Sequence, residues 1–118
     1  MAEPAAPLTT AMFHVLLALA EGEKHGYAIL KDVAEQTGGE VRLGAGTLYA
    51  IIKRLLIDGL IVEVRNRPAA DQEDQRRRYY QLTDAGRTAA MAEAARMEKV
   101  LVRARRAIKA FRTAQEAR

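Results

Sequence analysis

The fold is decided by the stretch GAGTLYAIIKRLLIDGLIVEVR, residues 44–65. Its first part repeats apolar residues at the spacing of one helix face, namely Leu48, Ile51, Ile52 and Leu55. Asp58 and Gly59 end this helix. From residue 60 to residue 67 the pattern changes to the alternation of a half-buried strand, with Val62 and Val64 between charged neighbours. The stretch therefore predicts a helix that passes through a short turn into a strand.

Two further helices are predicted before this stretch. The first has Thr9 or Thr10 as its cap and carries apolar residues at helical spacing, which are Leu8, Met12, Val15, Leu16 and Leu19. The second begins near His25 and stops at Gly38 and Gly39, and one of its faces is marked by Tyr27, Leu30, Val33 and Ala34. The short segment 41–43 is compatible with a small strand.

A second strand, residues 78–82, is predicted beyond a polar segment that contains Pro68 and three acidic residues, Asp71, Glu73 and Asp74. This segment is too polar to be core, so we interpret it as the exposed loop of a hairpin. Within the strand, Tyr80 and Leu82 are expected to support the core. Three helices followed by a two-stranded hairpin predict a mainly α fold with a small β-hairpin, which is the order of a winged helix-turn-helix.

From residue 83 to about residue 116 the sequence predicts one long helix, with Gly86 in its first turn as the only weak point. Its apolar residues alternate spacings of four and three, as in a heptad seam: Ala90, Ala94, Met97, Leu101, Ala104, Ile108 and Phe111. Such a helix would be about 50 Å long, which is longer than a small three-helix domain covers. We expect it to dimerise, and the alternative is a monomeric helix that covers the core.

The length and composition fit one compact unit. The chain has 118 residues, of which 49% are hydrophobic and 29% charged, a balance typical of globular proteins. We expect a flexible N-terminus (1–7), a winged helix-turn-helix DNA-binding domain (8–82) and a C-terminal dimerisation helix (83–118).

Several classes of function are disfavoured by the residues that the chain lacks. There is no cysteine, and the only histidines are His14 and His25, so we predict no metal site, no cofactor and no catalytic centre. We assign His25 a structural role. The longest apolar runs, such as 15–20, are too short to span a membrane, and residues 1–7 lack the features of a secretory signal. The expected location is the cytoplasm.

The net charge of +4 is by itself a weak pointer to nucleic acid. Residues 83–118 hold 9 basic and 4 acidic side chains, a net charge of +5, so residues 1–82 carry −1. Only the positions of individual basic residues can therefore indicate DNA binding.

The helix predicted within 44–57 offers such a placement, because it has no acidic residue. Opposite its apolar face, or on the flanks, lie small, basic and a few larger residues: Gly46, Tyr49, Ala50, Lys53, Arg54 and Ile57. Small residues permit close approach to a major groove, and the hydroxyls of Thr47 and Tyr49 can reach phosphates or base edges. Lys53 and Arg54 are expected to pair with phosphate. The alternative is that these two cations only solubilise a surface helix.

A second basic group, Arg76, Arg77 and Arg78, runs into the second hairpin strand. As the tip of a wing, these side chains are expected to contact phosphates or a minor groove. The alternative pairs them with the three acidic residues of the hairpin loop. Tyr27, at the start of the second helix, is expected either in the core or against a phosphate.

Four ordered motifs lie between residues 8 and 86: HGYAIL (25–30), GTLY (46–49), the stretch 55–61 that ends in DGLI, and RRYYQLT (77–83) with Gly86. Together they resemble the PadR family of bacterial transcriptional regulators. The resemblance implies a winged helix-turn-helix, a homodimer formed largely through the C-terminal helix, and repression of a nearby promoter. The single C-terminal helix is similar to the short PadR subclass, which includes multidrug-responsive regulators.

The chain departs from the family pattern at two points. Ala45 stands where the family often has proline, and the chain has no tryptophan, the residue that a multidrug-binding member uses to stack flat drugs. A small-molecule effector is nevertheless a further expectation, in a pocket near Val15, Met97 and Leu101.

The sequence thus predicts a sequence-specific, homodimeric repressor that binds double-stranded DNA, with half-sites about 34 Å apart. The alternative is a winged-helix module that binds another protein and no DNA. The acidic balance of residues 1–82 is the feature that favours this alternative.

Overall fold

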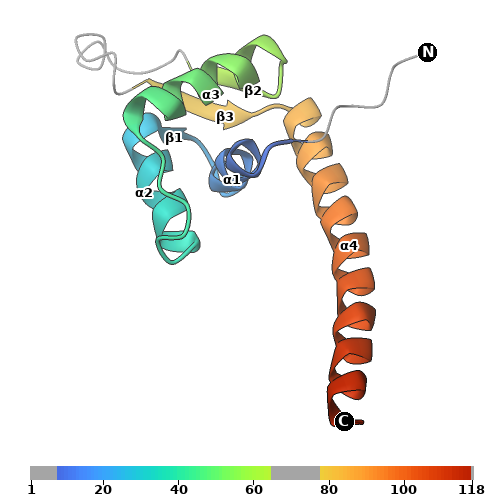
Figure 1. Cartoon of the computed structure of the whole chain (residues 1–118). Coiled ribbons are helices and arrows are strands. Elements are labelled where there is room, and N and C mark those ends of the chain that lie inside the picture. The colour runs from blue at the N-terminus through green and yellow to red at the C-terminus, as the bar shows by residue number, and fades with distance from the viewer. Residues whose placement is uncertain (1–7, 65–77, 118) are drawn as a thin grey trace.

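The computed structural model describes residues 8–64 and 78–117. The elements in chain order are α1 (Thr10–Ala18), β1 (Lys24–His25), α2 (Gly26–Gln36), α3 (Ala45–Ile57), β2 (Ile61–Val64), β3 (Tyr79–Leu82) and α4 (Asp84–Glu116). The first three helices and the strands form a compact head, and α4 projects from it as a long arm (Figure 1). The fold is mainly helical with a small antiparallel sheet, as the sequence predicts.

The sheet has three strands in the order β1-β3-β2, so the prediction of a two-stranded hairpin is incomplete. β2 and β3 pair from Ile61 opposite Leu82 to Val64 opposite Tyr79, and β1 adds Lys24 and His25 to the other edge of β3. A strand of two residues has no visible alternation, which is why the sequence pattern did not reveal it. The segment 41–43, considered as a small strand, is irregular.

Side chains cap the starts of α1 and α2, and of these two caps the one at Thr9 was predicted. The Thr9 hydroxyl accepts a hydrogen bond from the Met12 amide at 3.1 Å, and His25 Nδ1 accepts one from the Ala28 amide at 3.1 Å. The His25 ring also meets the Tyr79 ring edge to face, with centroids 5.3 Å apart. His25 therefore has the structural role assigned to it, at the junction between β1 and α2.

The core lies between the three short helices and one face of the sheet. Its fully buried or nearly buried members include Val15, Leu16, Ile29, Val33, Leu48, Ile52, Leu55, Ile61, Tyr80 and Leu82. The predicted inner face of α3 and the inward positions of β3 are confirmed. Burial raises the pKa of the Tyr80 phenol above its ordinary value, and the nearby Glu63 carboxylate adds to this effect.

The predicted inner face of α2 is wrong at its first residue. Tyr27 is 69% exposed, whereas Gly26, Ile29 and Val33 are buried. Gly26 is buried because α3 passes close to the start of α2: a Cβ at Gly26 would lie only 2.8 Å from Tyr49 Oη. The buried face of α2 therefore begins at Gly26, and Tyr27 lies in solvent.

The start of α4 is held against the turn that follows α3. The Thr83 hydroxyl donates to the Gly59 carbonyl at 2.6 Å and accepts from the Gly86 amide at 3.0 Å. A Cβ at Gly86 would overlap the Leu60 carbonyl oxygen, so the apparent weak point of the helix is a residue that the close approach requires.

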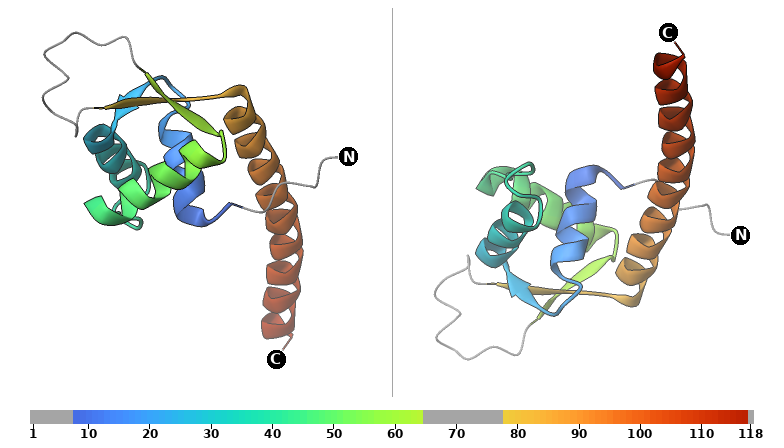
Figure 2. Two further views of the ribbon diagram at one scale, coloured as in Figure 1. Left: turned by 90° about the horizontal axis from the view of Figure 1, so that it is seen from above. Right: turned by 90° about the horizontal axis from the view of Figure 1, so that it is seen from below.

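Beyond this junction, α4 lies beside the head for a short distance and then leaves it, as the views from above and below agree (Figure 2). Ala90 packs against the core, and Glu93 Oε1 accepts a hydrogen bond from the Leu8 amide at 3.2 Å. Past Arg96 nearly all side chains are exposed. None of the helices formed by residues 8–64 and 78–117 has the length and hydropathy needed to cross a membrane.

Candidate nucleic-acid interface

The outer face of α3 is open and contains no acidic side chain. Residues 44–47 are all exposed at the start of the helix, and Ala50, Lys53 and Ile57 continue the exposed face toward its end. Leu48, Ile52 and Leu55 point into the core and hold the helix in place. The buried face and the exposed face of α3 are therefore those predicted from the sequence.

Tyr49 and Tyr27 lie where α2 and α3 start next to each other. Tyr49 is 38% exposed, and its hydroxyl is directed toward Gly26 at the start of α2. Tyr27 projects into solvent, with its ring beside that of His25 at a centroid separation of 6.4 Å. Of the two expectations for Tyr27, the core position is wrong, and a contact with a phosphate stays a prediction.

The two cations on α3 have different environments. Arg54 Nε donates to Asp58 Oδ2 at 3.1 Å, and both side chains face solvent. Lys53 is exposed and has no ion pair with any of the described residues. The charge of Arg54 is thus offset by Asp58, whereas no acidic side chain among residues 8–64 and 78–117 offsets the charge of Lys53. The spacing of four residues between Arg54 and Asp58 was the signal for this pair.

The wing is described only at its base. Arg78 Nε lies 3.4 Å from Glu63 Oε1 on the neighbouring strand, and the side chains are partly exposed. Arg76 and Arg77 lie outside the described residues, as do the three acidic residues with which the alternative pairs them. Of these three arginines only Arg78 is described, and its partner is Glu63. Neither of the two expectations for the arginines named Glu63.

The residues predicted for dimerisation divide into two groups. Ala90 is half-buried against its own core, because the first turns of α4 lie on the head. The others lie farther along and, apart from the half-buried Ala104, are exposed: Ala94, Met97, Leu101, Ile108 and Phe111. A mostly apolar groove of about 460 Å³ runs along this part of α4, lined by Glu93, Arg96, Met97, Val100, Leu101 and Ala104.

The predicted effector pocket is wrong in one of its three residues. Met97 and Leu101 line the groove on α4, but Val15 is 0% exposed and belongs to the core of the head. Val15 is instead part of the cluster of buried residues formed by α1, α2, α3 and the sheet.

Two further basic residues lie beside the start of α3 and were not selected from the sequence. Lys31 is one turn after Tyr27 on α2, and Arg42 lies just before the Gly44 cap of α3. Their spacing from Tyr27 and Gly44 was visible in the sequence. Among the described residues, no three His, Cys, Asp or Glu side chains gather in a way that could hold a metal ion.

These features define a class of protein, the winged helix-turn-helix proteins: a helix pair α2–α3, a small antiparallel sheet after it, and an exposed second helix without acidic residues. The chain belongs to the PadR-like family of transcriptional regulators, whose family model matches residues 15–92. The family prediction is therefore confirmed. Members of this family are transcription regulators and not enzymes.

Solved structures of similar fold agree with this membership. A transcriptional regulator from Clostridium thermocellum is 22% identical with a TM-score of 0.67, over 84% of this chain and 96% of that one. A PadR family regulator from Clostridium difficile is 26% identical with a TM-score of 0.64, over 80% and 97%. Bacillus subtilis PadR, solved in complex with operator DNA, is 23% identical with a TM-score of 0.60, over 71% of this chain and 46% of that chain.

A curated relative is an uncharacterized 37.1 kDa transposon protein of Streptomyces fradiae, 42% identical over 86 residues. The match covers 73% of this chain and 22% of the relative. The chain thus spans about a fifth of that protein and less than half of Bacillus subtilis PadR.

Proposed function

We propose that this protein is a sequence-specific DNA-binding regulator that acts as a homodimer and represses a nearby promoter. The observation that carries the proposal is the exposed, acid-free face of α3, on which Lys53 has no ion pair with any residue that the structure describes. Family membership supports the same conclusion. Bacillus subtilis PadR, a structural relative with the same fold, was solved on operator DNA.

In the proposed complex, α3 enters the major groove. The absence of large side chains at Gly46 and Ala50 lets the helix backbone approach the bases, and the Thr47 hydroxyl bonds with a base edge or a phosphate. Lys53 binds a phosphate, and Tyr27 and Tyr49 bind the backbone from the start of α2 and α3. Arg76, Arg77 and Arg78 contact the DNA beside the groove, with Arg78 held in register by Glu63.

Dimerisation is proposed to use α4. Met97, Leu101 and Ile108 each leave nearly half of their surface in solvent, at the spacing of a helix seam. A second α4 would cover them, and a two-fold axis would place the two α3 helices on half-sites about 34 Å apart. We propose residues 8–82 as the DNA-reading unit and 83–118 as the dimerisation helix.

An effector, if the regulator responds to one, is proposed to bind the apolar groove beside Met97 and Leu101. The groove is on the dimer helix, so a ligand there would alter how the two heads are held relative to each other. Promoter DNA is in the bacterial cytoplasm, which is therefore the proposed compartment.

The test compares Lys53→Ala and Arg54→Ala in binding to the DNA upstream of the gene. Lys53→Ala is expected to weaken binding about 10-fold and to lower the salt dependence by about one phosphate contact. Arg54→Ala is expected to cost less, because Asp58 already offsets its charge. Fluorescence anisotropy at several salt concentrations measures both effects. Lys109→Ala, an exposed cation on α4, is the matched control, and unchanged binding by Lys53→Ala would refute the role of α3.

The second candidate function is a protein-binding module without DNA contact, which the net charge of −1 over residues 1–82 favours. Genomic footprinting separates the two candidates. Protected sites at promoters support the regulator, and no protection anywhere supports the protein-binding module.

A further inference from the structure

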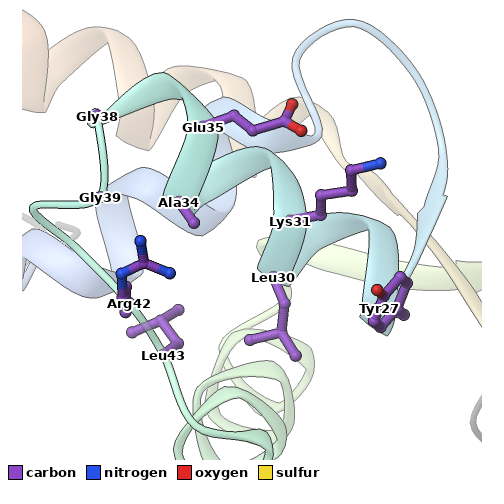
Figure 3. Close-up of a pocket in the computed structure, with 9 residues that line it drawn as sticks. All are labelled: Tyr27, Leu30, Lys31, Ala34, Glu35, Gly38, Gly39, Arg42 and Leu43. Atoms are coloured by element: carbon purple, nitrogen blue, oxygen red, sulfur yellow. The ribbon is translucent and has the colours of Figure 1, made fainter.

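A groove of about 490 Å³ separates α2 from the segment that leads into α3 (Figure 3). Leu30, Ala34 and Leu43 form its apolar floor, and Tyr27, Lys31 and Glu35 project from α2 along one rim. Arg42 comes from the opposite wall. The groove therefore combines an apolar floor with hydrogen-bonding and charged groups on both sides.

The segment that contains Arg42 is held in place by hydrogen bonds to the end of α2. The Thr37 hydroxyl donates to the Val33 carbonyl at 2.8 Å and accepts from the Val41 amide at 3.0 Å, which ties the returning segment to the end of α2. Gly39 has a φ of +84°, and a Cβ there would lie 3.1 Å from Arg42 Nη2. The guanidinium group thus lies beside the backbone of Gly39, while the Arg42 residue as a whole is exposed.

The charge of the groove is net positive. Neither Lys31 nor Arg42 forms an ion pair within the part of the chain that the structure describes. Glu35, the acidic residue on the rim, is not within ion-pair distance of either cation. Two cations and the Tyr27 hydroxyl are therefore available to an anionic ligand, and one carboxylate opposes it.

The groove adjoins the face of α3 that we propose to read DNA. Tyr27 at one end follows Gly26, which is in contact with Tyr49 of α3, and Leu43 at the other side precedes the Gly44 cap of α3. In helix-turn-helix proteins the helix before the recognition helix crosses the DNA backbone. A duplex seated on α3 would bring one strand of its backbone along this groove.

We propose that this groove is a clamp for the DNA backbone, in which Lys31 and Arg42 bind phosphate from opposite sides and the Tyr27 hydroxyl donates to a phosphate oxygen. The apolar floor would accept the deoxyribose between two phosphates. This proposal rests on the proposed function, and it adds an anchor that is independent of sequence to the contacts made by α3. Arg42 suits the role because its planar fork binds two phosphate oxygens at once.

The test measures affinity and salt dependence of the full-length protein for the upstream DNA and for an unrelated duplex of equal length. Lys31→Gln and Arg42→Gln are each expected to weaken binding about five-fold and to reduce the slope of log K against log salt by about 0.9. The loss should be equal for both duplexes, because phosphate contacts do not read sequence. Glu35→Gln removes the opposing charge and should strengthen binding about two-fold. Lys109→Gln on α4 is the charge-matched control.

The outcomes separate this proposal from the one on which it rests. Wild-type protein that binds neither duplex refutes the proposed function and the clamp with it. Binding that is weakened by Lys53→Ala but unchanged in affinity and slope by Lys31→Gln and Arg42→Gln keeps the function and overturns the clamp.

A calorimetric titration with inorganic phosphate in the absence of DNA tests whether the groove serves a free anion. Phosphate binding that is lost in Arg42→Gln, together with unchanged DNA affinity, would also overturn the clamp. No measurable phosphate binding, combined with the expected loss of DNA affinity, supports it.

Discussion

The head and the arm of this molecule use apolar residues in opposite ways. The head contains side chains that are completely buried within a single chain, namely Val15, Leu16, Ile29, Leu48 and Leu55. On α4, apolar residues at a regular spacing remain close to half exposed, and these include Met97, Leu101 and Ile108. The head thus buries a core within one chain, whereas the far part of the arm leaves a regular apolar stripe in water.

This difference indicates two separate sources of stability. Burial of apolar surface within the head stabilises the head at any protein concentration. A single helix that projects into solvent gains little from its own hydrogen bonds, so the far part of α4 depends on what covers it. The proposed second copy would make the arm, but not the head, sensitive to protein concentration.

The largest effect is expected for a core residue of the head. Leu48→Ala removes a side chain that is 0% exposed and should lower the free energy of unfolding by about 3 kcal/mol. Leu56→Ala, on the exposed side of the same helix, is the control and should cost less than about 1 kcal/mol. Urea unfolding at two protein concentrations measures both. Equal losses for the two variants would contradict the assignment of the core.

The next effect concerns the arm. Leu101→Lys combined with Ile108→Lys should weaken self-association at least about 100-fold, or about 3 kcal/mol, because two charges replace apolar residues of the seam. Sedimentation equilibrium is the measurement, and circular dichroism checks that the head stays folded. Lysines placed at Ala92 and Ala110, on the opposite face of α4, form the control. A dimer that persists in the seam variant would show that another surface holds it.

A smaller effect is expected at the junction between the two regions. Gly86→Ala places a methyl group into the Leu60 carbonyl and should destabilise the protein by about 2 kcal/mol through forced displacement of α4. Gly46→Ala, where no atom lies within 4 Å of the added methyl, is the control and should stabilise by about 0.5 kcal/mol. Thermal unfolding distinguishes the two. If both variants raised the stability of the protein, the junction would tolerate a side chain at residue 86.

The smallest effect depends on pH and on Glu93, which joins α4 to the start of α1. The hydrogen bond from Arg96, with a further one from the Leu8 amide, lowers the pKa of Glu93 from its ordinary value of 4.5. The stability from these contacts is therefore present above pH 4.5 and is lost as the pH falls through the lower folded value. Urea midpoints of wild type and Glu93→Gln should differ at neutral pH and converge in acid. A difference that is independent of pH would exclude the carboxylate as its source.

Much of the head was predictable from local sequence because its signals are strong. The apolar repeat of α3, the cap at Thr9, and the stop at Asp58 and Gly59 all appear where expected. The family motifs cover the same segments, and the acid-free outer face of α3 follows directly from helix geometry.

What the sequence did not predict depends on contacts between distant segments. β1 pairs with an edge of β3, Gly26 and not Tyr27 faces α3, and Arg78 pairs with Glu63 on a neighbouring strand. Val15 was misplaced for the same reason, since helical spacing does not show which neighbour covers a side chain. The dimer seam itself remains a prediction, because a helix period indicates a partner without identifying it.

The junction at Thr83 and Gly86 also makes α4 a lever. Two hydrogen bonds between Thr83 and residues 59–60, together with the contact at Gly86, fix the direction in which a rigid helix leaves the head. Over a helix of about 50 Å, a rotation of about 1° at this point moves the far end by about 0.9 Å. A small displacement of the turn that ends α3 therefore moves the far end of α4 by a larger distance. Conversely, a movement of the far end of α4 displaces this turn by a much smaller distance.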